Sequence, residues 1–157
     1  MFSQTSEYAL RVVAFLAGRG EEPATTRQIA FATRIPEGYL AKVIQSLGRT
    51  GIIASQRGMG GGSILAISPE SLTLHQVVEA IDPIPRIRTC PLGLRSHGKN
   101  LCAVHKRLDD AMAMVEKSLK EATIADMLRE PNKSKPLCEV PEDAPAPGRF
   151  RLAVVKR

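Results

Sequence analysis

The sequence lacks the features that several common protein classes need. It has no tryptophan, and aromatic residues make up 4% of its 157 residues, so a stacking surface for single-stranded nucleic acid or sugars is not expected. No apolar run approaches the roughly 20 residues that cross a bilayer, which predicts a protein without a membrane partner. Residues 1–4 lack the basic start and apolar stretch of a signal peptide. We therefore expect a cytoplasmic protein.

Cysteine is also scarce. Cys90, Cys102 and Cys138 are an odd number, which does not fit a disulfide framework in a reducing compartment. The sequence has no C-x-x-C motif beside a strand-helix-strand pattern and no nucleotide-binding glycine motif before a helix, so a thiol redox enzyme is disfavoured. Metal binding or redox sensing is the better use for these thiols.

The composition predicts a single soluble core with a preference for polyanions. Hydrophobic residues make up 43% of the chain, and the mean hydropathy is -0.09. The net charge is +6 with a pI near 9.5. Residues 1–67 carry seven Lys or Arg against four Asp or Glu, and residues 131–157 carry six against three. The positive excess therefore lies at the two ends of the chain.

The first half of the chain predicts three helices and a hairpin. The first helix should begin at Thr5 or Ser6 and end at Gly18, and a capping box of Thr25 with Gln28 should start the second. Pro36 and Glu37 suit the first turn of a third helix. Its apolar stripe comprises Leu40, Val43, Ile44 and Leu47, and Gly51 should end it.

Two short strands follow, at residues 52–56 and 63–67, around the glycine-rich segment 57–62. The order of three helices and a hairpin is that of a winged helix-turn-helix. The predicted fold class is therefore mainly α with a small β-hairpin.

The second half predicts a long helix and a tail. A capping box of Thr73 with Gln76 should start a short helix, a loop should span residues 84–99, and an apolar stripe predicts a long helix over residues 100–121. That helix could pair with its copy in a homodimer or pack on its own domain. Five prolines predict a disordered tail over residues 131–157. We expect a DNA-binding domain at 1–72 and a sensor loop with a dimerisation helix at 73–130.

Basic and small residues at the third helix and the hairpin predict contact with duplex DNA. The start of that helix should lie in the major groove, where Lys42 can reach guanine or phosphate and Tyr39 a phosphate. Arg57 at the hairpin tip suits the minor groove or backbone. The alternative is an ordinary core helix and a solvated basic hairpin, but capping, hairpin and charge all agree on one module.

Residues 90–105 place two thiols and two imidazoles close together in the sequence. Cys102 and His105 are three apart on a predicted helix and share a face, and a glycine-bearing loop can bring Cys90 and His97 towards them. Such a donor set suits a [2Fe-2S] cluster or zinc. The alternatives are half-buried thiols or a redox pair that forms a disulfide.

Three stretches resemble the Rrf2 family of bacterial transcription regulators: residues 6–11, residues 35–40 and above all the glycine-rich segment 57–62. The resemblance covers residues 1 to about 130 and implies a homodimer that binds a partly palindromic operator and regulates transcription, as a repressor. The DNA contacts it favours, together with the residues above, are Thr26, Gln28, Pro36, Gly38, Tyr39, Ala41, Lys42, Arg57, Gly58 and Gly60.

The resemblance also implies a ligand set. Cluster-binding members of the family have three cysteines in this loop, and Cys90 and Cys102 match the outer two. Ser96 stands at the middle position, with His97 beside it. His105 matches a histidine ligand, and Glu7 matches a carboxylate ligand supplied across the dimer. The candidate is a [2Fe-2S] cluster held by Cys90 and Cys102 with two of His97, His105 and Glu7. The alternative is a cluster-free regulator that responds to a protein or small molecule.

Overall fold

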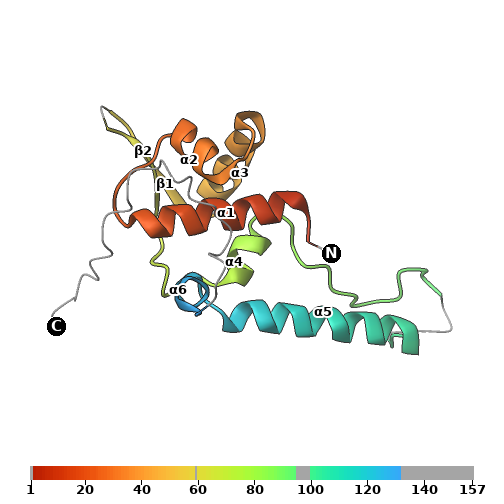
Figure 1. Ribbon diagram of the computed structural model, residues 1–157. Helices are drawn as coiled ribbons and strands as arrows, with labels where there is room; N and C mark the ends of the chain where they lie inside the picture. The colour runs from red at the N-terminus through yellow and green to blue at the C-terminus, as the bar shows by residue number, and fades with distance from the viewer. Residues whose placement is uncertain (1, 59, 95–99, 132–157) are drawn as a thin grey trace.

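The computed structural model describes residues 2–58, 60–94 and 100–131. The predicted tail lies outside these residues apart from Pro131, as do Ser96, His97 and Cys138. The elements are α1 (Gln4–Arg19), α2 (Thr26–Thr33), α3 (Glu37–Arg49), β1 (Ile53–Gln56), β2 (Gly62–Leu65), α4 (Leu74–Glu79), α5 (Ala103–Glu121) and α6 (Ile124–Arg129). The predicted fold class, a mainly helical winged helix with a small hairpin, is confirmed (Figure 1).

The first helix starts earlier and ends later than the sequence predicted. Its N-cap is Ser3, whose side chain accepts a hydrogen bond from the Ser6 backbone N–H at 3.2 Å, so neither Thr5 nor Ser6 is the cap. Ser6 is instead fully buried. Gly18 lies inside the helix, and Gly20, with a φ of 63°, ends it because a left-handed conformation suits glycine.

The next two helices form the helix-turn-helix. The predicted capping box is present at α2, where the Thr25 and Gln28 side chains each bond to the other residue's backbone N–H. Arg34 forms the turn to α3 with a φ of 55°. The buried side of α3, formed by Leu40, Val43 and Leu47, packs in the core with α1. The predicted stripe is therefore confirmed, with Ile44 half-buried at its edge.

The hairpin is held against the helices by a backbone bridge. β1 and β2 pair antiparallel, with Gln56 opposite Gly62. In addition, Ser63 of β2 exchanges two backbone hydrogen bonds, of 2.8 and 3.0 Å, with Ala24, which lies in the connection between α1 and α2. A Cβ added to Gly62 would lie 2.5 Å from the Ala24 backbone. Glycine is therefore required there by close approach, not by turn geometry.

Replacing Gly62 with alanine should destabilise the protein by about 1–3 kcal/mol, because the Ala24 backbone cannot move away without losing the bridge. The matched control is Gly18→Ala, since a Cβ there meets nothing within 4 Å. That change should stabilise α1 by about 0.5–1 kcal/mol. Urea unfolding of both variants measures the difference, and equal effects of the two alanines would contradict the bridge as the cause.

The two short helices of the second half begin side by side. The Leu74 N–H donates to the Ala122 carbonyl at 3.0 Å, and the Ile124 N–H donates to the Leu72 carbonyl at 2.8 Å. Each helix has a capping box, Thr73 with Gln76 and Thr123 with Asp126. Because these bonds fix both ends of the intervening segment, the chain leaves the core after α4 and returns to it at α6.

One hydrophobic core joins residues from both halves of the chain. Leu72, Val77 and Ile124 are fully buried in the same cluster as Val13 and Leu16 of α1. The domain boundary at residue 72 stays a prediction. No helix in the described part of the chain is long and apolar enough to span a membrane.

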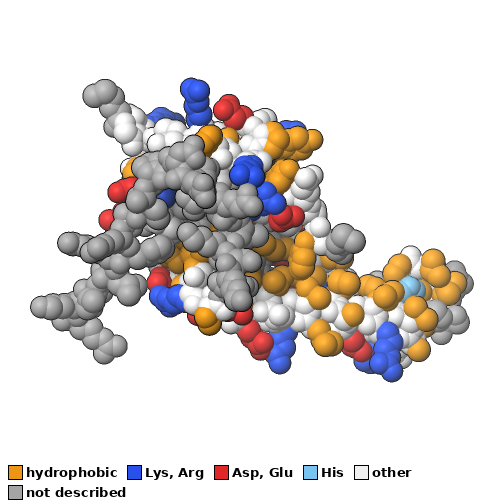
Figure 2. Space-filling model, in the orientation of Figure 1, with side chains coloured by type: hydrophobic (Ala, Val, Ile, Leu, Met, Phe, Trp, Pro, Cys, Tyr) orange, Lys and Arg blue, Asp and Glu red, His pale blue; other side chains and the backbone are white. Residues whose placement is uncertain are grey.

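The long helix α5 projects from this core (Figure 1). It begins at Ala103 with Cys102 as N-cap, later than the predicted residue 100. None of its 19 residues is buried. Val104 and Leu108 keep 66% and 49% of their surface exposed, and Figure 2 shows hydrophobic side chains along this projecting arm.

Candidate DNA interface and cysteine site

The start of α3 presents small and basic residues to solvent. Gly38, Ala41 and Lys42 are exposed, whereas Leu40 and Val43 between and beside them are buried. A helix with one face in the core offers its other face to a groove of matching width. Pro36 is the N-cap of α3 and is also exposed. The candidate residues of this helix therefore lie together on an open surface.

The remaining candidates lie on α2 and at the wing. Thr26, Gln28, Arg57, Gly58 and Gly60 are all exposed. The side-chain oxygen of Gln28 is already used in the capping box, where it accepts a hydrogen bond from the Thr25 N–H at 2.9 Å. Its amide nitrogen is the group that remains for a phosphate. The roles of these residues in DNA binding stay predictions.

Tyr39 has a structural contact that the sequence did not reveal. Its ring lies edge-on to the Tyr8 ring of α1, with centroids 6.5 Å apart, and the Arg11 guanidinium lies 5.8 Å from the Tyr8 centroid. Tyr39 is nevertheless 60% exposed. The ring pair fixes the start of α3 against α1 and leaves part of Tyr39 accessible. Tyr8 and Tyr39 are 31 residues apart, so no local pattern could have predicted their contact.

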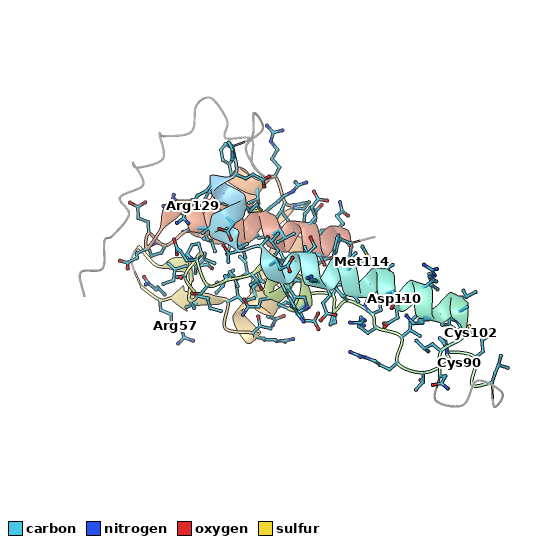
Figure 3. All side chains as sticks on the ribbon, turned by 90° about the horizontal axis from the view of Figure 1, so that it is seen from below. Arg57, Cys90, Cys102, Asp110, Met114 and Arg129 are labelled. Atoms are coloured by element: carbon cyan, nitrogen blue, oxygen red, sulfur yellow. The ribbon has the colours of Figure 1, made fainter. Side chains whose placement is uncertain are left out.

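Cys90 and Cys102 lie together at the far end of α5, whereas Arg57 lies at the opposite end of the molecule (Figure 3). Both cysteines are half-buried thiols that form no disulfide. Cys102 Sγ lies 3.4 Å from His105 Nδ1, which is the one-turn contact predicted from their spacing. Cys90 begins a turn in which its carbonyl accepts the Gly93 N–H at 3.0 Å.

The described residues supply part of the predicted ligand set. Over residues 2–58, 60–94 and 100–131, no group of three or more Cys, His, Asp or Glu side chains is placed to hold a metal ion. His97 lies outside them. Glu7 pairs with Arg11 on α1, and the N-terminal end of α5 projects away from α1 (Figure 1). Within one chain, Cys102 and His105 therefore lie together and Glu7 lies apart from them. This separation is what a ligand supplied by a second chain would show.

Arg86 links the segment before Cys90 to α5, a role that no local pattern in the sequence predicted. Its Nε and Nη2 donate to the two carboxylate oxygens of Asp109 at 2.7 and 2.8 Å, and its Nη1 donates to Glu116 at 2.8 Å. The Ile87 N–H adds a bond to Asp109 at 2.9 Å. We call Arg86, Asp109 and Glu116 the Arg86 clamp.

The clamp shifts the acidity of its members. Hydrogen bonds from Arg86, and next from the Ile87 N–H, hold the pKa of Asp109 well below its ordinary value. Hydrogen bonds from Lys120 and then Arg86 lower the pKa of Glu116 to about 2. Asp109, and next Glu116, raises the pKa of Arg86. All three groups are therefore charged at neutral pH.

These shifts predict a loss of stability in acid. Because the folded pKa of Glu116 and Asp109 is depressed, their contribution is full above about pH 4.5 and falls as the pH drops towards 2. Arg86→Met should make this decline shallower. Most of the change should come from Asp109, because Arg86 is the main cause of its lowered pKa. Urea unfolding at a series of pH values from 6 to about 2.5 measures it. An unchanged pH dependence in the variant would contradict the clamp.

Comparison with known proteins identifies the family. Residues 2–130 match the model of Rrf2, described as an iron-dependent transcriptional regulator. The chain belongs to the Rrf2 family. It is therefore a DNA-binding transcriptional regulator and not an enzyme.

Individual Rrf2 relatives agree in sequence and fold. The HTH-type transcriptional regulator NsrR of Geobacillus kaustophilus is 32% identical over 131 residues, covering 80% of this chain and 87% of that one. The structure of T. potens IscR has a TM-score of 0.69 at 25% identity, over 82% of this chain and 86% of that one. CymR, the global cysteine regulator of B. subtilis, has a TM-score of 0.69 at 22% identity, covering 84% and 98%.

Proposed function

We propose that this Rrf2 regulator is a homodimeric repressor whose operator binding responds to the state of Cys90 and Cys102. Residues 1–72 would bind DNA, and residues 73–130 would sense the signal and dimerise. The observation that carries the proposal is the division of the molecule, with an exposed recognition helix and wing at one end and the two thiols on a projecting helix at the other (Figure 3).

The homodimer is supported by the surface of α5. A helix of 19 residues with no fully buried side chain gains little stability from the core of one chain. Exposed Val104 and Leu108 are one turn apart on the same face. In a symmetric dimer, one contact between two copies of this face would remove the apolar surface of both subunits from water.

The donor atoms of the cysteine site are of the kinds that bind iron. Thiolates of Cys90 and Cys102 with an imidazole from His105 are ligands suited to a [2Fe-2S] cluster, with the last place for His97 or the partner subunit's Glu7. When bound, the cluster would supply a redox- and oxygen-sensitive centre. The description of the family as iron-dependent and the likeness to IscR and NsrR agree with this assignment.

The route from the thiols to DNA follows the chain. Cys102 is the N-cap residue of α5, so a change at the site would move the end of that helix. In a dimer, movement of α5 changes the spacing of the two recognition helices, and operator affinity depends on that spacing. The wing and α3 need not change shape themselves.

Visible absorption of protein purified without oxygen tests the proposal. The wild type should be coloured, Cys90→Ala and Cys102→Ala should be colourless, and Cys138→Ala should keep its colour as the matched control. Operator binding, followed by fluorescence anisotropy, should differ between the cluster-loaded and cluster-free wild type. A wild type that stays colourless after anaerobic reconstitution would exclude the cluster.

The second candidate function is a cluster-free thiol switch, favoured by the 3.4 Å contact between Cys102 and His105. In that case a mild oxidant would join Cys90 to Cys102 as a disulfide, with the oxidant taking up the two electrons and two protons. Operator affinity would then change on oxidation in a colourless protein, and Cys90→Ala would abolish the change.

A further inference from the structure

We propose that Arg86 is the positioning residue of the cysteine site: through the Arg86 clamp it fixes the segment that carries Cys90 alongside the helix that carries Cys102. The inference rests on the proposed function for its biological meaning. Its geometry, however, can be tested on the thiols alone.

The clamp closes the base of the loop that holds both cysteines. Arg86 is four residues before Cys90, and Asp109 is seven residues after Cys102, which is two turns or about 10 Å along α5. The contact between them spans 23 residues of sequence. The Ile87 N–H bonds to the same carboxylate, so two adjacent residues shortly before Cys90 are tied to Asp109 of α5.

The clamp is built for fixed geometry. The planar guanidinium donates in parallel to both oxygens of Asp109 and turns its remaining nitrogen to Glu116. The three side chains are only 15–23% exposed, in contrast to the Lys106–Asp110 pair on the same helix at 67% and 54%. A fork shared by two half-buried carboxylates restrains the backbone more than an exposed pair does.

The clamp also reaches α4, which packs against α1. Glu116 Oε1 lies 3.9 Å from His75 Nε2 of α4. A displacement of the Cys90 segment therefore changes the restraints on Glu116, which faces α4. This contact gives the cysteine loop a path to the core that does not pass through the far end of α5.

Thiol bridging measures the position of Cys90 directly. The experiment uses the full chain with Cys138→Ser, reduced and free of metal, and the reagent dibromobimane, which becomes fluorescent when it bridges two neighbouring thiols. Arg86→Met should lower the bridging rate roughly fivefold or more, because the two thiols are no longer held together. Arg86→Lys should be intermediate, since a lysine keeps the charge and loses the fork.

The controls separate positioning from folding and from charge. Lys106→Met removes an exposed ion pair of α5 next to Cys102 and should bridge like the wild type. Asp109→Asn removes the charge from the clamp with little change of shape and should behave like Arg86→Met. Circular dichroism and thermal melting identify any variant that fails to fold, and bridging is compared among the folded ones.

The outcomes are distinct. An unchanged bridging rate in both Arg86→Met and Asp109→Asn would overturn the proposal, as would an equal loss in Lys106→Met. In anaerobically loaded protein, Arg86→Met should also lose iron to a chelator roughly tenfold faster, the effect expected of an outer-shell partner. A colourless wild type with clamp-dependent bridging would remove the cluster and leave the positioning role.

Discussion

Replacing Lys42 and Arg57 with alanine together should weaken operator binding by about three orders of magnitude or more, because a dimer would lose four predicted contacts, each worth about 1–3 kcal/mol. A dimer would lose four cations at the DNA. The dependence of log affinity on log salt should therefore become shallower by about 3.6, at about 0.9 for each phosphate contact. Both residues are exposed, so the fold should tolerate the change.

The measurement is anisotropy titration at several salt concentrations on a duplex selected from a random pool. The matched control is Lys106→Ala with Lys117→Ala, two exposed cations on α5 whose removal changes the net charge equally. Because general attraction to DNA falls equally in both variants, the difference isolates local contact. Equal losses in the two variants would mean that α3 and the wing do not bind the operator.

The starts of α2 and α4 and the hairpin could be predicted because their signals are local. Thr25 with Gln28 and Thr73 with Gln76 are capping boxes within four residues, and the structure has both. The glycine-rich hairpin tip is equally local. The predictions erred at the ends of elements, as with Ser3, where several hydroxyls near one another could cap the same helix.

The cysteine site was predictable only in part. Cys102 and His105 are one turn apart, so their contact follows from helix geometry. Arg86 reaches Asp109 and Glu116 across 23 and 30 residues, and that pairing depends on how the connecting segment folds back on α5. The predicted role of Glu7 as a ligand would depend on a second chain. Contacts set by tertiary or quaternary arrangement leave no periodicity in the sequence.

Replacing Leu108 with aspartate should convert the dimer into monomers and lower operator affinity by two orders of magnitude or more. Leu108 is 49% exposed and Val104, one turn earlier, is 66% exposed. In the single chain an aspartate there meets water and costs little. In a dimer that buries this face it would be an unpaired buried charge, and a monomer contacts one half-site only.

Analytical ultracentrifugation measures whether the dimer is lost, and circular dichroism measures whether the chain stays folded. The variant should keep the helical circular dichroism signal of a folded chain and should still unfold cooperatively. The reason is that the substituted face lies outside the core of one chain. Lys117→Asp is the control: it changes the charge by more than Leu108→Asp, yet Lys117 is 76% exposed and, at 100° per residue, lies on the side of α5 opposite to Leu108. That variant should stay dimeric. If Leu108→Asp stays dimeric as well, subunit pairing uses a different surface, and the transmission of the cysteine signal through α5 must be replaced by the route through Glu116 and α4.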